Sequence, residues 1–214
     1  MTFTLLEFFR MGGIVMWPLL FFSIAAIAIT IERTIYFLYH DRKLDDLKEK
    51  TAEAIRSGNL SEIQAFLESH TRRRMGARVL LALVNRRQTF GARVSERRLE
   101  KAVETEAAAG IALMESGLNL LTTLASLAPL TGFLGTVTGM IAAFRSIAEA
   151  ADVNAQIVAG GIYEALITTV FGLVIAIVAM SAHSIFTNIV DKYVSDLEIV
   201  CSDLIIDIVT KEES

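Results

Sequence analysis

Residues Met11–Ile31 have the sequence MGGIVMWPLLFFSIAAIAITI, a run without a single charged side chain. The hydrocarbon core of a bilayer is roughly 30 Å thick, and a helix rises about 1.5 Å per residue. An uncharged apolar run of about 18 or more residues is therefore typical of a membrane span. Trp17 and Pro18 lie near its start, where an interfacial aromatic ring and a first-turn proline are both favourable.

Two further stretches have the same character. Ser116–Phe144 contains no charge and is rich in small and hydroxyl-bearing residues, and residues 158–190 carry only Tyr163, Glu164 and His183 as ionisable groups. Hydrophobic residues make up 53% of the 214-residue chain. The sequence therefore predicts an all-α integral membrane protein with three transmembrane helices, the second and third extended into a helical cytoplasmic domain.

Charge decides the orientation. Lys and Arg gather between the first and second spans, whereas the short turn after the second span has Glu149 and Asp152 and no basic residue. Loops rich in Lys and Arg stay in the cytoplasm. The predicted order is a periplasmic N-terminus (1–10), span one (11–38), a cytoplasmic helical loop (39–115), span two (116–147), a periplasmic turn (148–157), span three (158–190) and a cytoplasmic C-terminal helix (191–214).

Helical periodicity continues outside the membrane. Leu44, Leu47 and Ile55 predict a short helix that Gly58 ends. Ser61 and Gln64 have the spacing of a capping box that opens a second helix, and Met75–Val84 predicts a third. Two longer apolar stripes predict one helix that enters span two without a break and another that leaves span three: Leu99, Val103, Ala107, Ile111, Met114 and Leu118; Tyr193, Leu197, Val200, Leu204 and Ile208.

Thr136 and Thr169 are candidate pore residues because they lie at similar depths. Thr136 is nine residues from the outer end of span two near Arg145, and Thr169 is twelve residues from the start of span three near Ile157. Both depths are roughly 14–18 Å at 1.5 Å per residue. Hydroxyl groups at one level could line a pore. In the alternative interpretation they bond their own helix or join neighbouring helices.

Glu164 is the one carboxylate within a predicted span. It could belong to an ion path or form a polar lock near the outer mouth. Alternatively it is an interfacial carboxylate that reaches the headgroups and pairs with Arg145.

Small residues form the third feature of span two. Gly132, Gly135 and Gly139 leave a smooth helix face, and Pro129 removes a backbone donor in mid-helix. This pattern favours close helix packing, although glycine is also frequent in membrane helices generally.

Several protein classes are excluded or disfavoured. The sequence has no phosphate-binding glycine loop, HExxH or GxSxG motif, so we expect neither an enzyme nor a bound cofactor. The single cysteine, Cys201, rules out an internal disulfide and a cysteine metal cluster. The net charge of −4 averages a basic loop and an acidic tail, and no nucleic-acid partner is expected.

Two motifs resemble those of a known family. Leu127–Met140 (LAPLTGFLGTVTGM) resembles the second-span signature of the ExbB/TolQ/MotA proton-channel family, and Gly160–Leu173 (GGIYEALITTVFGL) resembles its third-span signature. Three spans fit the ExbB/TolQ branch. In one respect the chain departs from the family pattern, because Ile177 and Val178 stand where many members have a proline shortly after the third-span Gly-Leu.

The resemblance implies a pentamer in the bacterial inner membrane around single-span helices of an ExbD- or TolR-like partner. That partner carries the proton-binding aspartate, while the channel subunit supplies pore-lining residues that match Thr136, Thr168, Thr169 and Glu164. Proton flow would energise TonB- or Tol-dependent outer-membrane transport through a TonB- or TolA-like protein. The alternatives are a structural membrane scaffold and a sodium-driven motor subunit.

Overall fold

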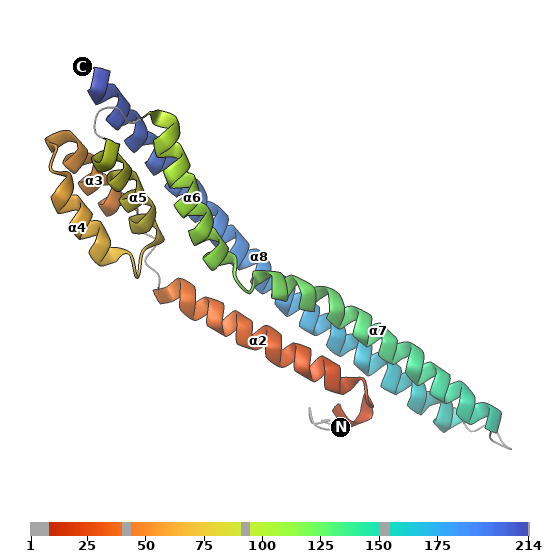
Figure 1. Cartoon of the computed structure of the whole chain (residues 1–214). Coiled ribbons are helices and arrows are strands. Elements are labelled where there is room, and N and C mark those ends of the chain that lie inside the picture. Colours follow the sequence, from red (N-terminus) through yellow and green to blue (C-terminus); the bar gives the residue numbers. More distant parts are fainter. Residues whose placement is uncertain (1–8, 40–43, 91–94, 150–154, 214) are drawn as a thin grey trace. The chain divides into compact units, whose positions relative to one another are not determined.

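The computed structural model describes residues 9–39, 44–90, 95–149 and 155–213, and it is helical throughout these ranges, with short turns between helices. The helices are α2 (Met16–Tyr39), α3 (Asp45–Ser57), α4 (Leu60–His70), α5 (Met75–Phe90), α6 (Glu96–Glu115), α7 (Leu118–Glu149) and α8 (Ala155–Glu213) (Figure 1). Three segments, in α2, α7 and α8, are long and apolar enough to cross a membrane. The predicted all-α fold with three spans is confirmed.

The chain divides into two compact units. Residues 1–33 and 117–186 form the membrane unit, and residues 34–116 and 187–214 form the loop unit. Each unit has its own buried residues.

In the membrane unit, α7 and α8 pack directly against each other through small residues. A Cβ atom on Gly172 would lie 2.5 Å from the carbonyl oxygen of Ala128, and one on Gly161 would lie 2.5 Å from Cβ of Ala143. These distances leave no room for a larger side chain. We call this contact line the seam; its members are Ala128, Gly132, Gly135, Gly139 and Ala143 on α7, and Gly161, Ala165, Thr168 and Gly172 on α8.

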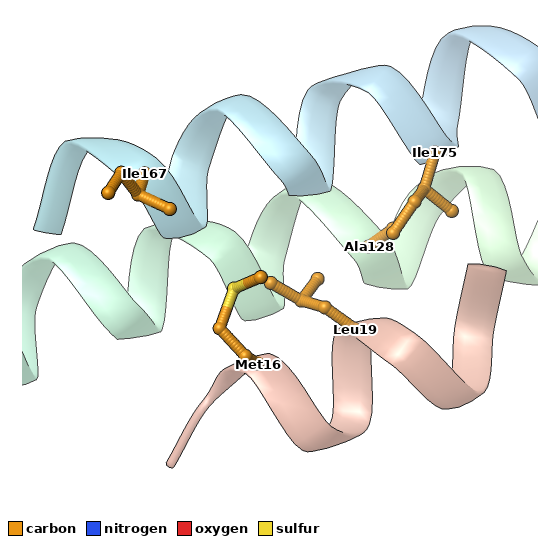
Figure 2. Packing of buried hydrophobic residues seen from close by; sticks show 5 residues of the cluster. All are labelled: Met16, Leu19, Ala128, Ile167 and Ile175. Carbon is orange, nitrogen blue, oxygen red and sulfur yellow. The ribbon is translucent and has the colours of Figure 1, made fainter. Parts of the chain in front are cut away.

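Helix α2 lies along one edge of this pair. Met16 and Leu19 point from α2 toward Ala128 of α7 and toward Ile167 and Ile175 of α8 (Figure 2). Met16 and Leu19 are almost fully buried, whereas Trp17 and Phe21 on the same helix are 65% and 68% exposed. One stripe of α2 therefore packs on protein and the rest is left for lipid, as expected for a helix at the rim of a bundle.

In the loop unit, α3, α4 and α5 bury leucines that include Leu47, Leu67, Leu80 and Leu83. The predicted stripe after span three is confirmed as core, since Tyr193, Leu197, Val200, Leu204 and Ile208 are all buried. The Gly76 N–H donates a 2.8 Å hydrogen bond to the hydroxyl oxygen of Tyr193.

Two local expectations are wrong. The predicted unbroken helix into span two is interrupted at Ser116 and Gly117, because Ser116 has an extended ψ of 128° and Gly117 a φ of +82°. The predicted capping box is also absent: the N-cap of α4 is Asn59, and Ser61 lies inside the helix. Gly58, by contrast, ends α3 in the left-handed conformation (φ +81°) as predicted.

Candidate functional site

The hydroxyl groups of Thr136 on α7 and Thr169 on α8 are in direct contact, and either one can be the donor. The carbonyl oxygen of Gly132 lies 3.3 Å from Oγ1 of Thr136 and 3.2 Å from Oγ1 of Thr169. The carbonyl oxygen of Ala165 lies 3.2 Å from Oγ1 of Thr136. Two residues from different spans are thus joined at one level.

A hydroxyl group has a single proton, so these distances cannot all be hydrogen bonds at once. If Thr136 donates to Thr169, then Thr169 donates to the carbonyl of Gly132. If Thr169 donates to Thr136, then Thr136 donates to the carbonyl of Ala165 or of Gly132. Both threonine side chains are partly exposed at the edge of the seam. The pair can therefore exchange hydrogen bonds with water or with a partner group without losing its internal acceptors.

Thr168 has a different environment from its neighbour Thr169. Its side chain is buried, and its Oγ1 lies 2.8 Å from the carbonyl oxygen of Ala165 and 3.1 Å from that of Gly132. A Cβ on Gly135 would overlap this hydroxyl group. Thr168 thus fills the seam and does not reach the surface of the chain.

The glycines set the distance at which these groups meet. A Cβ on Gly132 would lie 2.7 Å from the carbonyl oxygen of Thr168 and 3.1 Å from Cα of Thr169. A Cβ on Gly139 would lie 3.1 Å from the carbonyl oxygen of Gly161. The glycines singled out in the sequence therefore lie in the seam, and Pro129 lies within α7 one turn from Gly132.

Glu164 lies apart from the threonine pair. Five residues separate it from Thr169, which turns the two side chains about 140° apart on a helix. The Glu164 carboxylate lies against Gly13, in the bend that precedes α2, so closely that a Cβ on Gly13 would overlap it. Arg145, considered as a partner for Glu164, instead pairs with Glu149 at 2.8 Å.

The sequence analysis assigned no role in helix packing to Gly12, Gly13, Gly161 or Gly172. The small residues Gly161, Ala165, Thr168 and Gly172 recur at steps of four and three, a signal that could have identified the α8 side of the seam. The contact of Gly13 with Glu164 has no such signal, because it joins residues that are far apart in the sequence.

Three apolar helices, two of them joined by a small-residue seam with hydroxyl groups at one level, define a multi-pass membrane protein. The model of the MotA/TolQ/ExbB proton channel family matches residues 60–199, and the chain belongs to this family.

Individual relatives agree with this assignment. Biopolymer transport protein ExbB-like 1 of Synechocystis is 32% identical over 207 residues, which cover 94% of this chain and 77% of the relative. ExbB-like 3 of the same organism is 34% identical over 83% of this chain and 82% of its own length. Biopolymer transport protein ExbB of Salmonella typhimurium is 28% identical over 90% of this chain and 79% of its own length.

Proposed function

We propose that this chain is the channel-side stator subunit of an inner-membrane complex that uses the proton motive force to energise biopolymer transport. The membership in a proton channel family and the biopolymer transport proteins among its relatives support this proposal. The observation that carries it is the contact between the Thr136 and Thr169 hydroxyl groups, which places exchangeable hydrogen-bond donors and acceptors at one level of two adjacent spans.

The proposed mechanism needs a second protein. Within the described parts of α2 and α7 that are candidate spans, no acid lies at the level of the threonine pair, and Glu164 on α8 turns away from it. A threonine hydroxyl group does not itself titrate near neutral pH, but it can orient water or a carboxyl group. The titrating acid would come from an ExbD- or TolR-like single-span helix, held inside a ring of copies of this chain that we propose to be a pentamer.

In this proposal the N-terminus and the 148–157 turn face the periplasm, and the basic loop and C-terminus face the cytoplasm. Thr136 and Thr169 orient the proton-carrying groups, Glu164 acts as a polar lock, and a TonB- or TolA-like protein receives the motion. Thr168 is assigned to the seam because its hydroxyl group is buried.

A structural scaffold is the second candidate, and one observation favours it. The threonine hydroxyl groups also reach backbone carbonyls across the seam, which is a contact that holds helices together whether or not ions pass.

The substitution Thr169→Val separates the two functions. It keeps the side-chain shape and removes the hydroxyl group, so we expect the oligomer to assemble with its partner while proton flux falls to background. Flux is measured in proteoliposomes that contain both proteins, as acidification under a proton gradient and as sodium uptake under a sodium gradient.

The matched control is Thr138→Val on α7, whose exposed hydroxyl group lies 3.0 Å from the carbonyl oxygen of Leu134 in its own helix. It is expected to conduct normally. Full flux through Thr169→Val would refute the role given to that hydroxyl group, and equal loss in both variants would indicate a general packing defect.

A further inference from the structure

The chain bends at Gly12 and Gly13 immediately before α2 begins. Gly13 has a φ of +65°, in the region that residues with a Cβ rarely adopt. Its carbonyl oxygen accepts a 3.3 Å hydrogen bond from the Met16 N–H, which starts the first turn of α2. The bend is thus the N-terminal entry to the helix.

Both glycines of the bend face one turn of α8. A Cβ on Gly12 would lie 2.5 Å from Cγ of Met16 and 3.3 Å from Cγ2 of Ile167, and one on Gly13 would lie 3.0 Å from Cδ of Glu164 and overlap Oε1. Glu164 and Ile167 are three residues apart, so they are neighbours on the same face of a helix. The backbone of the bend therefore sits directly on the Glu164 carboxylate and its neighbour.

Apolar contacts next to the Glu164 carboxylate fix the position of the bend. Met16 and Leu19, in the first turn of α2, pack on Ile167 and Ile175 of α8 (Figure 2). Phe9 and Val15 pack against that cluster. These apolar contacts join the start of α2 to α8, so the bend cannot move away from Glu164 without uncovering them.

A carboxylate within a membrane span costs free energy unless polar groups surround it. Among the described residues, neither a side chain nor a backbone N–H forms a hydrogen bond or an ion pair with Glu164, and its Oε1 occupies the space that a Cβ on Gly13 would fill. What the bend gives the carboxylate is space, because Gly13 has no Cβ and the carboxylate can lie against it.

We propose that the Gly12–Gly13 bend is a seat for the Glu164 carboxylate, and that Gly13 is a positioning residue for it. Gly13 serves in two ways: it adopts the positive φ of the bend, and it lets the carboxylate approach the backbone. The seat ties α2 to α8 on the edge away from the threonine pair. Any effect of the seat on proton flux rests on the role of polar lock proposed above for Glu164. The contact between Gly13 and Glu164 does not depend on that role.

The test uses the full chain in native-like membranes and a hydrophobic carbodiimide that modifies carboxyl groups. The extent of modification of Glu164 is followed by peptide mass spectrometry in the wild type and in Gly13→Ala. Because the added methyl group would displace the carboxylate from its seat, we expect Glu164 of Gly13→Ala to react several-fold faster. Equal rates in the two proteins would overturn the proposal.

Gly117→Ala is the matched control in the same unit. Gly117 also has a positive φ (+82°), but a Cβ there would meet only ordinary contacts, at 3.6 Å from Ile29 and 3.8 Å from Arg33. We expect its Glu164 to react at the wild-type rate. If Gly117→Ala accelerates the reaction as much as Gly13→Ala does, backbone strain explains the change and the seat is refuted.

Gly13→Ala could fail to accumulate in the membrane, and a second variant covers that outcome. Gly13→Ala/Glu164→Ala keeps the strained φ but removes the carboxylate that the methyl group would strike, so it is expected to accumulate to a higher level than Gly13→Ala; equal accumulation of the two variants overturns the proposal. Labelling and accumulation do not depend on proton flux. Altered labelling in a chain that never conducts would refute the proposed channel function and leave the seat intact.

Discussion

At the scale of single residues, two buried threonines differ in what their hydroxyl groups contact. Thr168 reaches two carbonyl oxygens, whereas Oγ1 of Thr51 is buried with no hydrogen-bond partner among the described residues. Removing a hydroxyl group that makes a hydrogen bond costs about 1 kcal/mol, whereas removing an unsatisfied one is neutral or stabilising.

We therefore expect Thr168→Val to lower the free energy of unfolding by about 1 kcal/mol, and Thr51→Val to leave it unchanged or raise it by a similar amount. Thermal unfolding of the purified protein in detergent measures both. A loss of stability in Thr51→Val equal to that in Thr168→Val would show that the hydroxyl group of Thr51 has a partner after all.

Burial raises the pKa of the Cys201 thiol to about 12, with a smaller contribution from the nearby Glu198 carboxylate. Only the thiolate is a good nucleophile, so we expect Cys201 to resist a maleimide reagent at pH 8 in the folded protein and to react fully after denaturation.

The raised pKa of Cys201 also makes the stability of the folded chain depend on pH. The folded chain holds the Cys201 proton more tightly than the unfolded chain, whose thiol has the ordinary pKa of 9.0. This contribution to stability is complete below about pH 9 and declines as the pH rises toward 12. Rapid labelling of the folded protein at pH 8 would contradict the burial of this thiol.

Sequence alone located the threonine pair and could not locate the seat of Glu164. The depths of Thr136 and Thr169 follow from counting residues along two adjacent helices, because the helical rise is constant. The partner of Glu164 depends on which edge of α8 is covered by α2, and no residue count contains that information. The alternatives weighed for Glu164 therefore named Arg145 and not Gly13.

At the scale of helices, the seam makes α7 and α8 depend on each other. Gly172 would place a Cβ 2.5 Å from a backbone oxygen of α7, and backbone atoms cannot rotate aside as a side chain can. We expect Gly172→Ala to push the helices apart and to cost about 1–3 kcal/mol, as overpacking does.

Gly160→Ala is the control for Gly172→Ala, because it lies on the same helix and its Cβ would meet nothing within 4 Å. Thermal stability in detergent and the yield of the proposed oligomer are measured for both. Equal behaviour of the two variants would show that the seam is looser than the distances indicate.

The break between α6 and α7 could not be predicted from the apolar pattern. Met114 and Leu118 keep the spacing of one helix face, and both are buried. The only local sign is Ser116-Gly117, a pair that is tolerated inside a helix as well as at its end. The spacing of apolar residues indicates which side chains are buried. A break in the helix between two buried residues can leave that spacing unchanged.

At the scale of the whole molecule, the number of spans follows from composition, because each span must keep about 20 residues largely free of charge. Orientation is a further step that rests on the distribution of Lys and Arg. It is tested with single cysteines in a Cys201→Ser background, at Arg72 and at Glu149, both of which are exposed.

In intact cells, a membrane-impermeant maleimide is expected to label Glu149→Cys and to leave Arg72→Cys unmodified until the cells are lysed. The expectation follows from the basic character of the segment that contains Arg72. The opposite pattern would invert the proposed topology and place the basic loop outside the cytoplasm.

The seam also limits how this protein can change over generations. Glycine is the smallest residue, so at Gly132, Gly161 and Gly172 every replacement adds atoms to a space that is already filled. On the outward faces of the same helices, residues such as Leu130 and Ile177 are largely exposed, and one apolar side chain can replace another at little cost. We therefore expect single substitutions to be tolerated on the outward side of α7 and α8, and changes in the seam to require a compensating change on the other helix.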